Sequence, residues 1–175
     1  MTAIRGRARR FGDDVNTDYI IASTRKRDTL DEQVLKLYLF EAVDPAFAAS
    51  VRPGDLIVAG RNFGCGSAME VAATVIVAAG IKAVLAESFS RTFYRNAVNN
   101  GLMPIACDTS RIREGDTLAI AYDADVPEVR DERTGAAMRG APFPQIMREI
   151  LSAGGLVGYV GARAKPDSAN IGTAN

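Results

Sequence analysis

The sequence predicts an α/β fold centred on a parallel β-α-β-α-β unit, and three features between residues 55 and 106 predict it. Three short apolar runs between turn residues, at 56–59, 83–86 and 102–106, suit strands buried on both faces of a sheet. The intervening segments, 68–79 and 88–100, are each followed by a glycine, where a helix commonly ends. Because the crossovers are short, the strands should be parallel and the connections right-handed.

The elements before this unit are expected to be one strand and two short helices. Residues 4–10 alternate arginines with apolar or small residues, which favours a first strand over a basic targeting segment. Thr29 and Glu32 have the spacing of a capping box, which predicts a helix from there to about Phe40. A second helix is expected over 44–50. The buried stripe of the first helix is expected to contain Leu30, Val34, Leu35, Leu37 and Tyr38.

After Pro104 the pattern changes to short runs separated by turn residues, which predicts a small antiparallel section. The expected strands cover 117–122, 127–130 and 136–139. Two prolines precede a helix over 145–152 that should end before Gly154. Small and polar residues predict a flexible tail over 161–175, which leaves 1–160 as a single domain.

The composition excludes several classes of protein. The charges of the 21 acidic and 21 basic residues cancel, whereas a general nucleic-acid binder normally has an excess of basic residues. No apolar run approaches the roughly 20 residues that span a bilayer, and the N-terminus lacks the apolar core of a secretory signal. A cytoplasmic location without nucleic-acid or membrane partners is therefore expected.

The chain is also poor in the residues that usually carry catalysis or metals. It contains no histidine, the commonest general base and metal ligand. Cys65 and Cys107 are too few to hold an iron–sulfur cluster, which typically takes about four thiolates. No metal site is therefore expected in this chain, and any catalysis would use a less usual proton carrier or share its chemistry with another chain.

The glycine-rich loop from Asn62 to Ser67 is the strongest candidate site. Its small residues, backbone N–H groups and position before a helix favour an anion such as a carboxylate or phosphate. The spacing matches neither a Walker loop nor a dinucleotide fingerprint. Ser67 and Glu70 have the spacing of a capping box, so Ser67 is either a helix cap or a catalytic oxygen, and the two roles are compatible.

Other polar residues have ordinary structural explanations. Asn16 and Asp18 are expected to form turns and caps. The cationic loop at 23–28 is either solvated or a binding site for a carboxylate. Arg91 and Arg95, four residues apart on one helix face, are expected to be solvated or ion-paired. Cys65 is expected to be a small buried apolar residue, and Met69 to be core or pocket wall.

Several separated stretches together resemble one family. They are the glycine loop at 62–67, the stretch 79–96, the motif at 14–18, the turn at 52–55 and the segment 149–156. Together they resemble the small subunit of the isopropylmalate isomerase and homoaconitase group of the aconitase superfamily. The resemblance runs from the first strand to about Tyr159.

The resemblance implies a fold, a partner and a reaction. The fold would be a swivelling β/β/α domain of three layers. The active site would lie between this chain and a large subunit that carries a [4Fe–4S] cluster, and this chain would bind no cofactor itself. The reaction would dehydrate and rehydrate a hydroxy di- or tricarboxylic acid. Ser67 would abstract the proton next to a carboxylate, while the partner's iron would take the hydroxyl as a Lewis acid.

The chain departs from the family pattern at two positions. Met69 and Val71 stand where the family usually has arginine and histidine. Because methionine cannot hold a carboxylate, either Arg25 or Arg27 replaces the arginine, or the substrate presents an apolar group. The cationic loop favours a homoaconitate-type substrate, and Met69 an alkyl-substituted malate. The candidate substrate-binding residues are Arg25, Arg27, Asn62, Gly64, Gly66 and Met69.

Two other functions remain open at this point. A carboxylate-binding module that has lost catalysis would explain Met69 and Val71. A phosphate-binding protein would use the same glycine loop.

Overall fold

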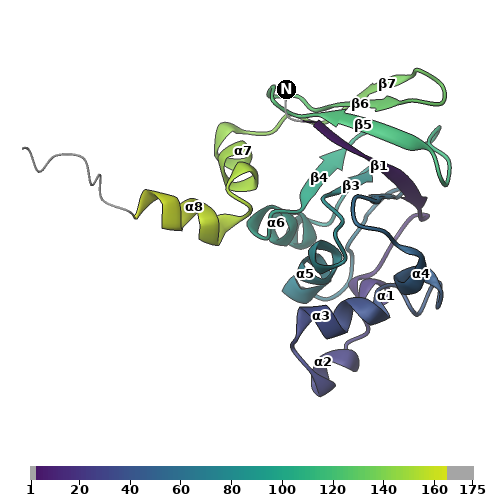
Figure 1. Ribbon diagram of the computed structural model, residues 1–175, viewed down its shortest axis with the longest axis vertical. Coiled ribbons are helices and arrows are strands. Elements are labelled where there is room, and N and C mark those ends of the chain that lie inside the picture. The colour runs from purple at the N-terminus through teal and green to yellow at the C-terminus, as the bar shows by residue number, and fades with distance from the viewer. Residues whose placement is uncertain (1–2, 165–175) are drawn as a thin grey trace, which may run out of the picture.

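A computed structural model describes residues 3–164, and its framework is one curled seven-stranded sheet (Figure 1). The strand order is β4-β3-β2-β1-β5-β6-β7. The strands are β1 (Ala3–Arg10), β2 (Leu56–Val58), β3 (Ala83–Ala86), β4 (Met103–Ala106), β5 (Thr117–Ala121), β6 (Glu128–Asp131) and β7 (Ala137–Arg139). Strands β1 to β4 pair in parallel, whereas β1-β5, β5-β6 and β6-β7 pair antiparallel. The predicted parallel unit and antiparallel section are therefore both confirmed.

Helices connect and cover these strands. The two crossovers of the parallel unit contain α5 (Glu70–Ala78) and α6 (Arg91–Asn99). The short elements between β1 and β2 are α1 (Thr17–Ile20), α2 (Arg25–Asp28), α3 (Glu32–Leu35), the 3-10 turn η1 (Lys36–Tyr38) and α4 (Phe47–Ser50). Two helices follow β7, namely α7 (Gln145–Ser152) and α8 (Leu156–Arg163).

Apolar side chains fill both faces of the parallel part of the sheet and the inner face of the antiparallel part. One cluster joins the strands to α1, α3, α5 and α6, and it includes Ile57, Val84 and Phe93. On the other face, Leu85 of the parallel part and Ile120 of the antiparallel part belong to one cluster, because the sheet curls over itself (Figure 1). The result is a β/β/α arrangement, as the family resemblance implied.

The expected helix from Thr29 to about Phe40 is wrong in its start and its continuity, and of its expected buried stripe only Leu35 is buried, with Tyr38 packed at the edge of the core. The helix begins at Glu32, and the Asp31 side chain caps it by accepting from the Gln33 N–H at 2.8 Å. Leu30, Val34 and Leu37, expected in the buried stripe, are exposed. The buried residues are Leu35, Leu39 and Phe40.

Aromatic packing explains the difference. Phe40 has a left-handed backbone with φ of 57°, so the helical path does not continue through it. Its ring stacks on Phe11 at 4.2 Å between centroids and meets Phe47 edge-on at 5.0 Å. Tertiary contacts of this size override a local helical pattern.

The C-terminal part of the chain contains one helix that reaches past the expected domain end. Helix α8 continues to Arg163, inside the stretch 161–175 that was expected to be a flexible tail. Residues 165–175 of that stretch lie outside the described residues. Between residues 3 and 164, no helix is both long and apolar enough to cross a membrane.

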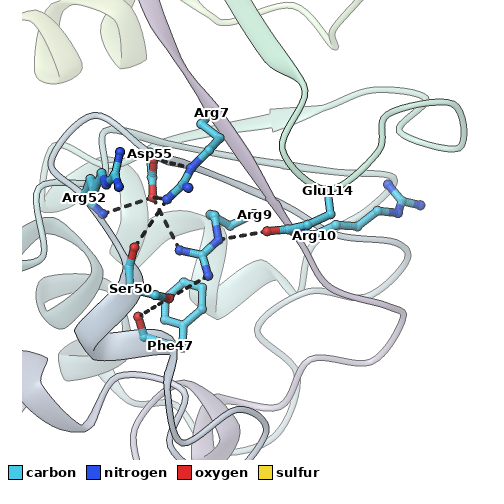
Figure 2. A network of polar contacts seen from close by, with 8 residues as sticks. All are labelled: Arg7, Arg9, Arg10, Phe47, Ser50, Arg52, Asp55 and Glu114. Atoms are coloured by element: carbon cyan, nitrogen blue, oxygen red, sulfur yellow. Dashed lines mark hydrogen bonds and ion pairs between the residues drawn. The ribbon is translucent and has the colours of Figure 1, made fainter.

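A buried carboxylate fastens β1 to the turn before β2 (Figure 2). Asp55 is 4% exposed and accepts from Arg7 Nη2 at 2.7 Å, from Arg9 Nη1 at 3.5 Å and from the Arg52 N–H at 3.0 Å. Burial on its own would raise the pKa of Asp55, but the hydrogen bonds and charge of the arginines outweigh it and hold this pKa below its usual range. The ionised form is therefore the one that stabilises the fold.

Arg9 extends this network to two more segments. Its Nε donates to Glu114 Oε1 at 3.0 Å, and its Nη2 donates to Ser50 Oγ at 2.9 Å. Its guanidinium also lies 4.5 Å from the centre of the Phe47 ring. The central strand is thereby held to α4 and to the turn before β5.

We expect Asp55→Asn to lower the free energy of unfolding by about 3 kcal/mol, because it leaves two arginines without their shared partner. Urea denaturation at pH 7 measures this, with Glu128→Gln, which alters an exposed ion pair, changing stability by less than about 0.5 kcal/mol. The difference between wild type and Asp55→Asn should shrink as the pH falls through the lowered pKa of Asp55. Equal stabilities at pH 7 would contradict this role.

Candidate functional site

The segment 60–69, which contains the glycine loop at 62–67, follows the carboxyl end of β2. The segment after β1 holds this loop on one side. The Gly64 N–H donates to the Val15 carbonyl at 2.8 Å, and the Thr17 N–H donates to the Cys65 carbonyl at 2.8 Å. Thr17 is buried, and its Oγ1 hydroxyl donates to the Ser67 carbonyl at 3.0 Å. The backbone of Ser67 is thus fixed by a residue 50 positions earlier in the chain.

The segment between β3 and α6 holds the other side of the loop. The Phe63 N–H donates to the Ser88 carbonyl at 3.0 Å, and the Ser90 N–H donates to the Phe63 carbonyl at 2.9 Å. Ser90 Oγ donates to the Gly64 carbonyl at 2.8 Å and also caps α6. The loop therefore lies between two backbone segments, at the edge where open α/β sheets usually bind ligands.

This confinement explains two of the glycines. A Cβ on Gly64 would lie 2.3 Å from Phe93, and one on Gly66 would lie 2.5 Å from the Asn16 side chain. Both glycines also have positive φ, of 78° and 92°. Gly64 is buried inside the loop, whereas Gly66 is exposed to solvent.

Ser67 is exposed and is not a helix cap. Helix α5 begins at Glu70 with Met69 as its N-cap residue and no side-chain cap bond, so the predicted capping box is wrong. The Glu70 carboxylate instead accepts from Asn100 Nδ2 at 3.2 Å. The chain from Ser67 to Met69 lies outside the helix, and Thr17 holds it there through the Ser67 carbonyl. The Ser67 hydroxyl is therefore available to a ligand.

Backbone donors gather beside this hydroxyl. Among the hydrogen bonds within residues 3–164, none is donated by the N–H groups from Gly66 to Glu70. Gly66, Ser67 and Ala68 are exposed, and Glu70 opens α5. Unpaired N–H groups at a helix N-terminus favour negative charge. This surface suits a carboxylate or a developing oxyanion.

The two candidate arginines of the 23–28 loop have different surroundings. Arg25 donates to Glu41 through Nε at 2.7 Å and Nη2 at 2.9 Å, and its guanidinium stacks 3.9 Å from the centre of the Tyr38 ring. The hydrogen bonds and charge of Glu41 raise the pKa of Arg25. Arg27 is exposed and has no ion pair or side-chain hydrogen bond among the described residues. Of these two arginines, Arg27 is thus the one that remains available.

Met69 and Asn62 are both committed to the protein's own structure. Met69 is 7% exposed and belongs to the core cluster beneath α5, so it does not line the open face of the loop. Asn62 has φ of 58°, and its Nδ2 donates to Asp14 Oδ1 at 2.9 Å. Met69 therefore supports the loop from the core, whereas Asn62 is exposed and bonded to Asp14.

The remaining candidates have structural roles. Asn16 caps α1 by accepting from the Asp18 N–H at 2.9 Å, as predicted. Cys107 is buried, and burial raises the pKa of its thiol to about 12. Cys65 is partly buried in the glycine loop. Sequence reasoning missed Thr17, because a buried threonine in a polar turn carries no signal of what its hydroxyl will contact.

Comparison with known proteins gives consistent matches over the whole described domain. Residues 10–110 match the family model of the aconitase C-terminal domain. The chain is 46% identical over 160 residues to the methanogen homoaconitase small subunit of Methanocaldococcus jannaschii, covering 91% of this chain and 92% of that protein. It is 43% identical over 161 residues to the 3-isopropylmalate dehydratase small subunit of Nautilia profundicola, and this match covers 91% of this chain and 95% of that protein.

A solved structure shows the same fold. The crystal structure of 3-isopropylmalate dehydratase from Methanocaldococcus jannaschii superposes with a TM-score of 0.87 at 44% identity. The superposition covers 93% of this chain and 95% of that one.

We expect Gly64→Ala to lower the free energy of unfolding by more than about 2 kcal/mol, because backbone strain adds to a collision with Phe93. Gly115→Ala is the matched control, since Gly115 also has positive φ, of 85°, but open space around its Cα. The control should lose only about 1 kcal/mol. Chemical denaturation compares them, and equal losses would show that the collision contributes nothing.

Proposed function

Because this chain belongs to the family of the aconitase C-terminal domain, we propose that it is the small subunit of a two-chain hydro-lyase with an active site shared between the chains. The reaction is the dehydration and rehydration of a hydroxy di- or tricarboxylic acid, as in the relatives named 3-isopropylmalate dehydratase. The relatives matched over most of their length are themselves small subunits, so the match accounts for a subunit and leaves a large subunit to complete the enzyme.

The observation that carries this proposal is the open position of Ser67. Its hydroxyl lies on an exposed loop, next to unpaired backbone N–H groups and at the carboxyl end of a parallel strand. Chemistry on carboxylic acids is helped by excluding water, because electrostatic interactions strengthen in a dry site. A second chain that covers the loop would supply this enclosure.

Within this site, Ser67 acts as the base that takes the proton next to a substrate carboxylate. A serine hydroxyl is a weak base at neutral pH, so its anionic form must be stabilised by nearby donors. The N–H groups of Gly66 to Glu70 and the N-terminal end of α5 provide that stabilisation. Thr17 keeps the backbone of Ser67 in place through its carbonyl.

The iron–sulfur cluster of this family does not fit the residues of this chain. The only two thiols are a partly buried Cys65 and a buried Cys107 whose pKa is raised to about 12, and a cluster takes about four thiolates. The described residues also contain no group of three or more potential metal ligands. We therefore place the cluster on the large subunit.

Substrate recognition falls to Arg27 among the cations of the 23–28 loop. Arg25 is neutralised by Glu41, and Met69 is buried, so neither is free to bind a carboxylate. The unpaired guanidinium of Arg27 is suited to the distal carboxylate of a homoaconitate-type substrate. In this arrangement Arg25 fixes the loop that presents Arg27.

We expect Ser67→Ala to lower kcat of the reconstituted complex by about 10³-fold, because it removes the base. The variant should bind the large subunit with unchanged affinity, since the Ser67 hydroxyl makes no hydrogen bond among residues 3–164 whose loss would alter the loop. Ser152→Ala, at an exposed serine of α7, is the control and should keep full activity. Anaerobic turnover of a panel of citrate-like and malate-like acids measures this, and near-normal turnover by Ser67→Ala would remove it as the base.

We expect Arg27→Ala to raise KM about tenfold for tricarboxylic substrates and to leave KM for alkyl-substituted malates nearly unchanged, because only the former present a second distal carboxylate. Arg130→Ala, at an exposed arginine of β6, is the control and should change neither constant. Steady-state kinetics on both substrates test this. Equal changes in KM for the tricarboxylic acids and the alkyl-substituted malates would mean that another residue binds the distal carboxylate.

A further inference from the structure

A second surface feature lies beside the glycine loop, at the carboxyl ends of β3 and β4. It is a cavity of about 590 Å³, a size typical of recognition sites in proteins. Its walls come from the start of α6, the segment before it and the end of β4. The lining residues are Glu87, Ser88, Phe89, Arg91, Tyr94, Arg95 and Ala106.

Two guanidinium groups of this cavity have no partner among residues 3–164. Arg91 and Arg95 are one helical turn apart on α6, and both are exposed. The acidic residue of the cavity, Glu87, forms an ion pair with neither of them. By contrast, Arg5 of β1, elsewhere on the molecule, is paired with Glu132 at 2.7 Å.

The floor of the cavity is apolar. The Phe89 and Tyr94 rings meet edge-on with centroids 5.7 Å apart, and Phe89 also stacks parallel to Phe93 at 6.4 Å. Burial raises the pKa of Tyr94, so its phenol stays neutral. Two arginines beside aromatic rings are complementary to an acidic side chain that has apolar neighbours.

Hydrogen bonds join the wall of the cavity to the glycine loop. The Asn62 N–H of the glycine loop donates to Ser88 Oγ of the cavity wall at 2.8 Å, and Phe63 pairs with the Ser88–Ser90 backbone. Both features therefore belong to the same edge of the sheet. A chain that covers the glycine loop extends over the cavity as well.

We propose that this cavity is the docking site for an acidic side chain of the large subunit, with Arg91 and Arg95 as its anchors. The inference rests on the proposed function, because it assigns the covering chain that the open Ser67 site requires. Exposed arginines bind a carboxylate weakly in water, whereas the same contacts strengthen once a partner excludes the solvent. A covering protein thus fits this surface better than a small free acid.

The test measures assembly directly and does not depend on turnover. The large subunit is titrated with wild-type small subunit and with the double variant Arg91→Glu/Arg95→Glu, by biolayer interferometry at several NaCl concentrations. We expect Kd to rise at least about 30-fold in the double variant at low salt, because two attractive contacts become repulsive. Added salt should weaken binding of the wild type, which loses an attraction, but improve binding of the double variant, because salt then screens a repulsion.

Two further variants control for charge and for folding. Arg130→Glu/Arg139→Glu changes the charge equally at the other end of the sheet and should leave Kd within about twofold. Arg91→Gln/Arg95→Gln removes the cations without adding repulsion and should still raise Kd about tenfold. Melting curves check that α6 is intact, and a glutamate at its first position suits the helix dipole.

The possible outcomes separate this inference from the proposed function. If Kd is unchanged in both Arg91→Glu/Arg95→Glu and Arg91→Gln/Arg95→Gln, the docking site is overturned, whatever the activity of the complex. Binding of free citrate that depends on Arg91, with unchanged assembly, also overturns it and makes the cavity a small-molecule site. Conversely, arginine-dependent assembly without hydro-lyase activity would sustain the docking site and refute the proposed function.

Discussion

The glycine loop is confined between two backbone segments, and the candidate site depends on this constraint. Residues 63–65 pair with Asn16 on one side and with Phe89 on the other, in the manner of a short strand. A Cβ at Gly64 would collide with Phe93 and one at Gly66 with Asn16, which is why glycines occupy these two positions. A chain held in this way presents Ser67 and its neighbouring N–H groups without needing a ligand to order them.

The architecture could be predicted from the sequence where local signals and burial agree. The runs at β2, β3 and β4 are apolar on both faces, and glycines follow α5 and α6. The apolar runs and the helix-ending glycines were therefore sufficient to predict these strands and helices. Between β1 and β2 they were not, because the path of the chain at Phe40 is decided by Phe11 and Phe47. Contacts between residues that are distant in sequence leave no trace in a helical pattern.

The candidate site was predictable in its location but not in its details. The glycine loop and Ser67 could be identified from motif and resemblance, but the capping role considered for Ser67 is wrong, because α5 begins only at Glu70 and Thr17 holds the Ser67 carbonyl outside the helix. Arg25 and Arg27 are equivalent in the sequence, yet Glu41 pairs with only one of them. Which cation is free depends on tertiary neighbours, and so does the burial of Met69.

The position of β1 in the sheet has a consequence for how the protein is made. Although β1 is the first strand in the sequence, it is central in the sheet, between β2 and β5, and Ala3 pairs with Ala121. On the ribosome this strand emerges before the other strands of the sheet, and more than a hundred further residues must follow before its antiparallel neighbour exists. Closing so long a loop is entropically costly and slows folding. During translation, the emerging chain thus exposes an unpaired strand edge of the kind that chaperones protect from aggregation.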